Sequence, residues 1–226
     1  TTAMMERYDL GAAAALLYEF FWNEYCDWYI ELSKQRLNSG DVLEKKIAQA
    51  ILTRVLRETM ELLHPFIPFI TEEVWQNLPH CGESIMVTRW PQAVAGLEFA
   101  EAVETMGWII DIIKAIRNIR SEANVAPGKK VAALFMGSPE KLGILKENSS
   151  ILTNLAGLES VQWLDEGNAA PEKAVSAVAG GVTIYLPLSG LIDLQKEVDR
   201  LTKELTQVEQ EMGRTAQRLE SPAFTS

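Results

Sequence analysis

The spacing of hydrophobic residues changes along the chain, and each spacing predicts a different kind of element. Residues 10–37 have a helical pattern whose second half, Phe20–Tyr29, is aromatic on nearly every side, so we expect one long helix buried on several sides. Residues 38–40 should end this helix, because Gly40 can adopt the left-handed conformation that is common after a helix. The first predicted element is therefore a long, largely internal helix.

A second helix is predicted from residue 42 to about His64. Asp41 can cap it, and Glu44 follows at the spacing of a capping box. Its inner face should be formed by apolar residues that recur every four positions: Leu43, Ile47, Ile51 and Val55. A proline disfavours helix at the residue before it, so Pro65 should stop this helix and Pro68 should help to start the next one.

The third helix should extend to about Leu78, with Thr71 or a neighbour as its cap and Glu72 and Glu73 near the positive end of its dipole. Residues 84–90 are expected to be extended. A fourth helix is predicted from about Leu97 to Glu122, with two adjacent apolar lines: Val103, Met106, Ile110 and Ile113, then Ile109, Ile112, Ile116 and Ile119. Helices of this length with short loops favour a four-helix-type bundle over residues 1–127.

Residues 128–190 have a different pattern, with β-type runs at 130–135, 161–164 and 182–186 and a helical pattern from 138 to about 155. Gly180 and Gly181 should form the turn before the last strand. This segment is expected to be a small α/β connector subdomain of about 60 residues, close to the smallest size that folds alone.

Residues 191–226 change period again. Apolar residues alternate at three- and four-residue spacing, at Leu191, Leu194, Val198, Leu201, Leu205, Val208, Met212 and Leu219, and only Thr215 breaks the series. This is the seam of a coiled coil, and a single helix cannot bury such a seam alone. The fold class predicted overall is mainly α: a helical bundle, a small α/β subdomain and a C-terminal coiled-coil helix.

The composition is that of a globular protein, with 226 residues, 47% of them hydrophobic and 23% charged. No apolar run approaches the ~20 residues that cross a bilayer, and the N-terminal residues lack the pattern of a signal peptide. The chain does not begin with Met, as expected of a segment of a larger protein. Cys26 and Cys81 form no Cys-x-x-Cys pair, so we expect no zinc site and a reducing, cytoplasmic location.

Five places in the chain resemble, in the same order, the valyl-tRNA synthetase family of class I aminoacyl-tRNA synthetases. They are Phe21–Tyr29, His64–Trp90, Ile116–Glu122 followed by Pro127, Val182–Asp193, and the seam that starts at Leu191. The isoleucyl family shares part of this pattern, but many bacterial members carry a C-terminal zinc-binding cysteine cluster that is absent here. Leucyl enzymes do not usually end in a long heptad arm. The seam therefore favours the valyl family, with an isoleucyl or leucyl type as the alternative.

The resemblance implies an anticodon-binding bundle at 1–127, a connector at 128–190 and, at 191–226, the first helix of an arm that packs against the outer corner of the L-shaped tRNA. It implies tRNA-Val and the catalytic domain of the same polypeptide as partners. The family's His-Ile-Gly-His and Lys-Met-Ser-Lys-Ser types of motif do not occur here. We therefore expect no catalytic residue, cofactor or metal in this chain, with ATP and Mg²⁺ in the parent enzyme.

RNA binding requires Lys and Arg for the phosphates and stacking or hydrogen bonding for unpaired bases. Basic residues at three-residue spacing lie on one face of the fourth predicted helix and just beyond it: Lys114, Arg117, Arg120, Lys129 and Lys130. A second candidate group flanks the first interhelix loop: Lys34, Arg36, Lys45 and Lys46. Either group has a plain alternative as a solvated helix face or loop. The aromatic residues Trp22, Tyr25, Trp28 and Tyr29 could stack on bases, but at helical spacing they are more often core.

Five basic residues of the arm could also face tRNA: Lys196, Arg200, Lys203, Arg214 and Arg218. Acidic residues are interleaved with them, so ordinary coiled-coil surface charge is the favoured interpretation. The net charge of −10 argues against strong autonomous RNA binding. Together with the unpaired seam, it leaves a second hypothesis, a helical interaction module that self-associates through its arm and is indifferent to RNA.

Overall fold

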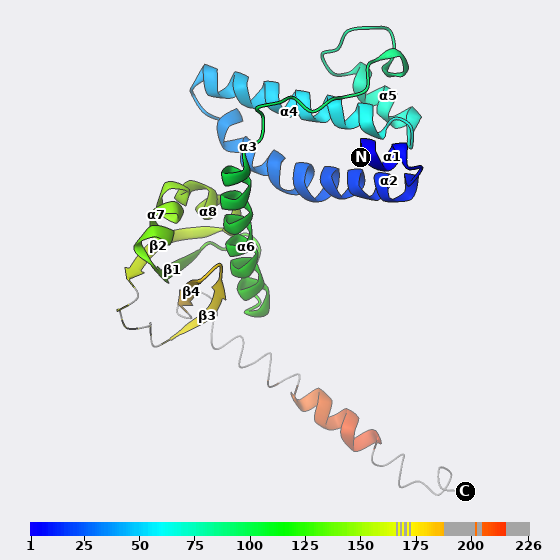
Figure 1. Cartoon of the computed structure of the whole chain (residues 1–226). Coiled ribbons are helices and arrows are strands. Elements are labelled where there is room, and N and C mark those ends of the chain that lie inside the picture. The colour runs from blue at the N-terminus through cyan, green and yellow to red at the C-terminus, as the bar shows by residue number, and fades with distance from the viewer. Residues whose placement is uncertain are drawn as a thin grey trace, which may run out of the picture. The chain divides into compact units, whose positions relative to one another are not determined.

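The structure is a computed structural model, which describes residues 1–165, 167, 169, 171, 173–187, 202 and 205–215. The chain forms two compact units, residues 1–98 and residues 99–226, and each is described by itself. Figure 1 shows a first unit made of helices and a second in which helices accompany a small sheet.

The first unit contains the predicted long helix as three consecutive segments. α2 (Leu10–Glu19), the π-helix η1 (Phe20–Tyr29) and α3 (Ile30–Leu37) follow one another without a break, after the short helix α1 (Thr2–Glu6). The boundaries confirm the predicted helix, but the aromatic half has π rather than α geometry, which the hydrophobic pattern did not indicate. π segments are rare and frequently occur at functional sites.

The second helix, α4 (Val42–Leu63), begins at the predicted cap, where the Asp41 carboxylate accepts hydrogen bonds from the amides of Leu43 and Glu44. Its predicted inner face is wrong. Leu43, Ile47 and Ile51 are 66%, 44% and 38% exposed, whereas the buried positions are Ala48, Thr59, Met60 and Leu63. The true inner face is rotated from the predicted line, and most of its buried positions lie in the C-terminal half of the helix, where Met60 and Leu63 join the core of the first unit.

The two prolines form the corner that the sequence predicts. α4 ends at Leu63, and α5 (Pro68–Gln76) starts with Pro68 in its first turn. Thr71 was a predicted cap of α5, but its side chain does not cap the helix. Its hydroxyl is fully buried, donates to the carbonyls of Ile67 and Pro68, and lies 2.8 Å from Nδ1 of His64. Thr71 therefore ties the corner together from inside.

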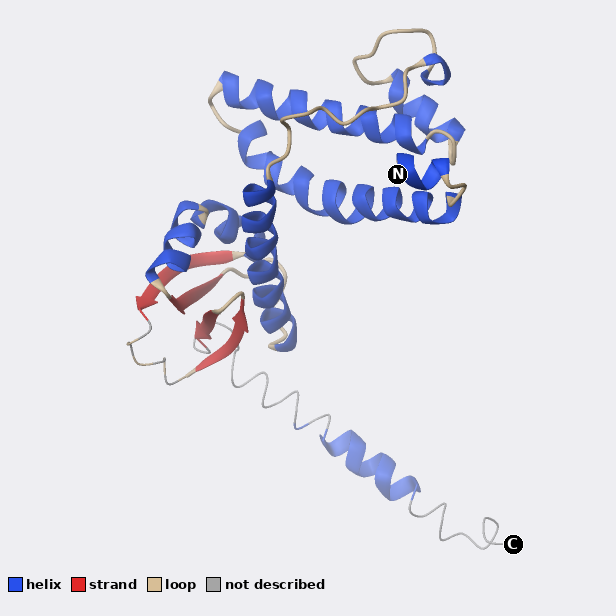
Figure 2. Cartoon of the chain, in the orientation of Figure 1, coloured by secondary structure: helices blue, strands red, loops and turns tan. Residues whose placement is uncertain are grey.

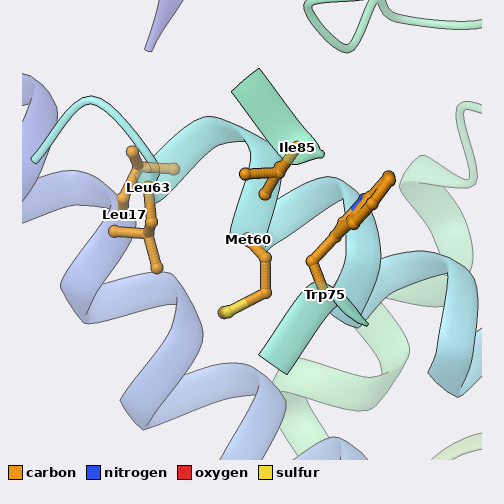
Figure 3. Close-up of a cluster of buried hydrophobic side chains, with 5 residues drawn as sticks. All are labelled: Leu17, Met60, Leu63, Trp75 and Ile85. Atoms are coloured by element: carbon orange, nitrogen blue, oxygen red, sulfur yellow. The ribbon is translucent and has the colours of Figure 1, made fainter. Parts of the chain in front are cut away.

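The first unit has its core beside this corner. Figure 3 shows the five buried side chains that form it: Leu17, Met60, Leu63, Trp75 and Ile85. Ile85 belongs to the short 3₁₀ helix η2 (Ile85–Val87), so the expectation of an extended segment at 84–90 is wrong. The carboxylate of Glu72 accepts hydrogen bonds from the Ser84 hydroxyl and the Ile85 amide, which holds the turn on α5.

The second unit is built on a four-stranded mixed sheet in the order β2–β1–β4–β3, whose strands are labelled in Figure 1 and drawn red in Figure 2. Its strands are β1 (Val131–Gly137), β2 (Leu158–Asp165), β3 (Ala174–Ala179) and β4 (Val182–Pro187). β1 and β2 are parallel, while β4 is antiparallel to both β1 and β3. Burial alternates along β1 and β4, so one face of the sheet is covered and the other is half exposed.

Three helices accompany this sheet: α6 (Ala100–Glu122), α7 (Pro139–Glu147) and α8 (Ser149–Ala156). α6 packs against β3 and α8, and it buries the line Ile109, Ile112, Ile113, Ile116 and Ile119, while Val103 is 71% exposed. The helix expected as the fourth member of the bundle thus groups with the α/β unit. The strand β3 was not predicted, and the helix expected at 138–155 is divided in two at Asn148.

The predicted division at residues 127 and 190 remains a prediction about domain organisation. The helical residues 205–215 include three members of the predicted seam, Leu205, Val208 and Met212, which are 59%, 52% and 68% exposed. The other seam positions lie outside the described residues, and a coiled coil is not shown.

Candidate nucleic-acid interface

An exposed pair of aromatic rings lies on the first unit where α2 passes into η1. Tyr18 and Trp22 are 61% and 53% exposed, although the sequence favoured a core position for Trp22. Their ring centroids are 6.4 Å apart and the two planes differ by only 3°. We call this exposed, parallel pair the aromatic platform, because exposed aromatic rings are the kind of group on which unpaired bases stack.

A second row of aromatic rings on the same helix is directed inward. Phe21, Tyr25 and Tyr29 stack in sequence, with ring centroids 5.8 Å and 6.2 Å apart. The Tyr25 hydroxyl donates to the carbonyl of Leu52 on α4, 3.0 Å away. Burial, with smaller contributions from Cys26 and Tyr29, raises the pKa of Tyr25 to about 12. The inner row therefore anchors the helix on α4 and holds the outer row, Tyr18 and Trp22, in place.

The basic residues around the first interhelix loop are exposed and partly neutralised. Lys34 forms an ion pair with Glu31, and Arg36 lies 3.7 Å from a carboxylate oxygen of Glu44. Lys45 and Lys46 are also exposed, in the first turns of α4. Exposed pairs of this kind are weak, typically worth about 0 to 1 kcal/mol, so they can be exchanged for a contact with phosphate.

Arg120 is placed very differently from the surface cation that the helical spacing predicts. It is only 8% exposed, and its Nη1 and Nη2 atoms donate to the carbonyls of Gly157 and Lys129, at 2.7 Å and 2.8 Å. The chain at Gly157 has a left-handed φ of 65° and passes so close that an added Cβ would lie 3.1 Å from Nη1. Arg120 thus joins the end of α6 to the starts of β1 and β2.

Arg117, one turn earlier on α6, has a related position at the surface. Its Nε and Nη2 atoms both donate to the carbonyl of Leu155, at 3.0 Å and 2.8 Å. The last carbonyls of a helix have no partner inside the helix, and α8 ends at Ala156. Arg117 therefore caps the C-terminus of α8 and complements its negative dipole end.

The three candidate lysines of this unit stay at the surface. Lys114 is 56% exposed and lies 3.8 Å from a carboxylate oxygen of Asp111. Lys129 and Lys130 are both exposed in the segment that leads into β1. The structure therefore divides the predicted basic group: two arginines bind backbone carbonyls, and three lysines present their ammonium groups at the surface.

The two histidines contribute to packing in the corner. The His80 ring stacks on Trp75 with centroids 3.7 Å apart, and Nε1 of Trp75 donates to Glu61 at 3.2 Å. In the part of the chain that the structure describes, no group of three His, Cys, Asp or Glu residues could hold a metal ion. None of the helices described is both long and apolar enough to span a membrane.

Comparisons with known proteins place the chain in a family. The family described as the anticodon-binding domain of tRNA ligase matches residues 1–135. Curated relatives include the valine–tRNA ligases of Carboxydothermus hydrogenoformans (46% identical over 224 residues), Geobacillus stearothermophilus (42% over 228) and Bacillus subtilis (40% over 230). The matches cover 98–99% of this chain but only 25–26% of those proteins. The chain therefore spans about a quarter of the length of these relatives, and it belongs to the family of anticodon-binding domains of tRNA ligases.

Proposed function

We propose that this chain is the tRNA-binding region of a valine–tRNA ligase, and that it binds the anticodon stem-loop and body of tRNA-Val. The identity of 38–46% to valine–tRNA ligases along nearly the whole chain supports the proposal, and it favours the valine enzyme over isoleucine or leucine types. The parent enzyme would supply ATP, Mg²⁺ and the catalytic domain. In it, the grip on the tRNA would orient the acceptor end at a distant active site.

The observation that carries this proposal is the exposed Tyr18–Trp22 pair within the matched family domain. An anticodon is a single-stranded loop, so its bases can be splayed out and stacked on aromatic rings. Stacking is worth about 1–3 kcal/mol per base. We propose that this pair stacks on bases of the loop, while Lys34, Arg36, Lys114, Lys129 and Lys130 contact phosphates.

The test is a binding titration of the 226-residue chain against a tRNA-Val transcript, an anticodon-swapped transcript and a non-cognate tRNA at two salt concentrations. We expect a preference for the native anticodon, and an affinity that falls as salt rises because lysines displace counterions. Binding that does not distinguish the three RNAs would contradict anticodon recognition by this chain.

A truncation in the platform tests its role. Trp22→Ala should weaken binding of the native transcript by about tenfold, the size of one lost stacking contact. Phe69→Ala is the matched control, because Phe69 is 91% exposed on α5 and lies outside the stacked pair. Equal losses in the two variants would show that the platform has no special part in binding.

We propose residues 191–226 as the first helix of a coiled-coil arm. The exposed Leu205, Val208 and Met212 in the described helical residues support this assignment. An unpaired seam predicts self-association of the isolated chain. Sedimentation should show a dimer that a triple serine substitution at these positions abolishes, whereas a monomeric unmodified chain would argue against it.

Both free cysteines, Cys26 and Cys81, are compatible with a reducing cytoplasm.

A further inference from the structure

Lys173 is a basic residue that the sequence does not connect with the candidate group, and the topology of the sheet places it there. It is exposed and directly precedes β3, whereas Lys129 and Lys130 directly precede β1. More than 40 positions separate these lysines along the chain. Whether they share an edge of the sheet depends on the directions of the two strands.

Strand directions bring the three lysines to one edge. β4 is antiparallel to β1 and also antiparallel to β3, so β1 and β3 run in the same direction on either side of β4. The first residues of both strands therefore lie at the same end of the sheet.

The register defines how closely the lysines are aligned. Tyr185 of β4 pairs with Leu134 of β1 and with Ser176 of β3. When the same offset is continued to the start of the strands, Lys173 falls level with Val131, next to the row of Lys130. Neighbouring strands are about 4.8 Å apart, so two strand spacings separate the backbones of Lys173 and Lys130 by roughly 10 Å.

We propose that Lys129, Lys130 and Lys173 form a basic edge that binds the phosphate backbone of RNA. This inference rests on the proposed function, which supplies RNA as the ligand. Long, flexible lysine stems with strongly hydrated ammonium groups suit contacts to phosphate, which fix the position of an RNA without reading its sequence. The arginine caps support the edge, because Arg120 holds the Lys129 carbonyl and Arg117 neutralises the end of α8.

An acidic residue marks where the basic edge ends. Glu159 is exposed near the start of β2, and β2 runs parallel to β1 on the side away from β3. Its carboxylate therefore lies at the same end of the sheet as the three lysines. A phosphate backbone should follow the edge from β1 toward β3 and avoid β2.

Two pairs of matched variants test this edge in the 226-residue chain with a tRNA-Val transcript. Lys173→Ala should lower affinity about threefold and make the plot of log affinity against log salt shallower by about 0.7 to 0.9, the value of one phosphate contact. Its control is Lys141→Ala on α7, which follows the opposite end of β1. The factor by which affinity falls should be the same for an anticodon-swapped transcript, because phosphates carry no sequence information.

A gain of affinity cannot result from poor folding, so the second pair removes negative charge. Glu159→Gln should raise affinity about threefold by removing repulsion at the edge. Asp165→Asn at the other end of β2 is the control, which we expect to leave affinity unchanged. A chain that binds tRNA but shows equal effects within each pair overturns the basic edge alone. A chain that binds no tRNA overturns the proposed function together with it.

Discussion

Substitution of Arg120 tests whether this residue is part of the framework or an RNA contact. Arg120→Ala removes two charge-assisted hydrogen bonds of 2.7 Å and 2.8 Å from a side chain that is only 8% exposed. Gly157 would keep the hydrogen bond from the Val131 amide, whereas the Lys129 carbonyl would lose its bond to Arg120. Bonds to charged groups are worth about 1.5–3 kcal/mol each, and the desolvation of the guanidinium offsets part of this. We expect a loss of about 3 kcal/mol in the free energy of unfolding.

The assay is urea unfolding followed by ¹⁹F NMR of fluorotryptophan-labelled chain, which reports separately on Trp108 and Trp163, the two tryptophans of the second unit. Arg117→Ala is the matched control on the same helix, and its exposed cap should contribute only about 1 kcal/mol. Arg120→Lys separates charge from geometry, because one ammonium group cannot replace the rigid, planar fork that bonds two carbonyls. A structural Arg120 predicts that the lysine variant is also destabilised.

A further variant tests the close approach at Gly157. Gly157→Ala would force alanine into a left-handed φ of 65° and set its Cβ 3.1 Å from Nη1 of Arg120, so it should cost about 1–2 kcal/mol or more. Because Arg120→Ala and Gly157→Ala disturb the same contact, the double variant should lose less stability than the sum of the two single losses. The reasoning is refuted if Arg120→Ala loses tRNA affinity while its free energy of unfolding stays within about 0.5 kcal/mol of that of the unmodified chain, the size of an ordinary surface change.

Three other perturbations follow from single contacts. Tyr25→Phe should lower the free energy of unfolding by about 1 kcal/mol, because it removes the hydrogen bond to Leu52. Since the pKa of Tyr25 is raised to about 12, this contribution to stability is complete below pH 10 and is lost as the pH rises toward 12. Unfolding of both forms at alkaline pH checks this. Gly180→Ala, with a Cβ 1.9 Å from Nε1 of Trp108, should destabilise the sheet unit by more than about 2 kcal/mol in the same urea assay. The pKa of Glu72 is lowered by hydrogen bonds to its carboxylate, of which the one from Gln76 has the largest effect. The turn at residues 84–87 that Glu72 holds should therefore loosen only as the pH falls through that lowered pKa, which NMR titration of the carboxyl group can follow.

Local signals were sufficient where chemistry alone decides the structure. Asp41 caps α4, Pro68 starts α5, and Gly180 and Gly181 form the turn between β3 and β4, because capping and turn preferences act over a few residues. The strand β3 was missed because Ala174–Ala179 is short and rich in alanine, and its place depends on pairing with β4. The prediction of the inner face of α4 was wrong because a four-residue period fits more than one helix face, and packing partners decide which face is buried.

The candidate site was predictable in composition but not in role. Trp22 and Tyr25 lie three positions apart in one aromatic run, and the sequence treats them alike, yet one is 53% exposed and the other 5%. The contact of Tyr25 with α4 distinguishes the inner row from the outer one, and the spacing does not encode the position of α4. An aromatic run on a helix therefore predicts burial of one row and leaves the identity of that row to tertiary packing.

The same ambiguity applies to charge, with a consequence for how basic residues are assigned to RNA. Lys114, Arg117 and Arg120 occupy one helix at equal spacing, but the arginines bind carbonyls at the end of α8 and just before β1 and β2, while the lysine stays exposed. Arginine presents a planar fork suited to carbonyl pairs, whereas lysine presents a hydrated point charge. Residue type therefore carried more information than spacing. Topology then adds what neither could show, since Lys173 joins Lys130 at one edge only because β1 and β3 run in the same direction across β4.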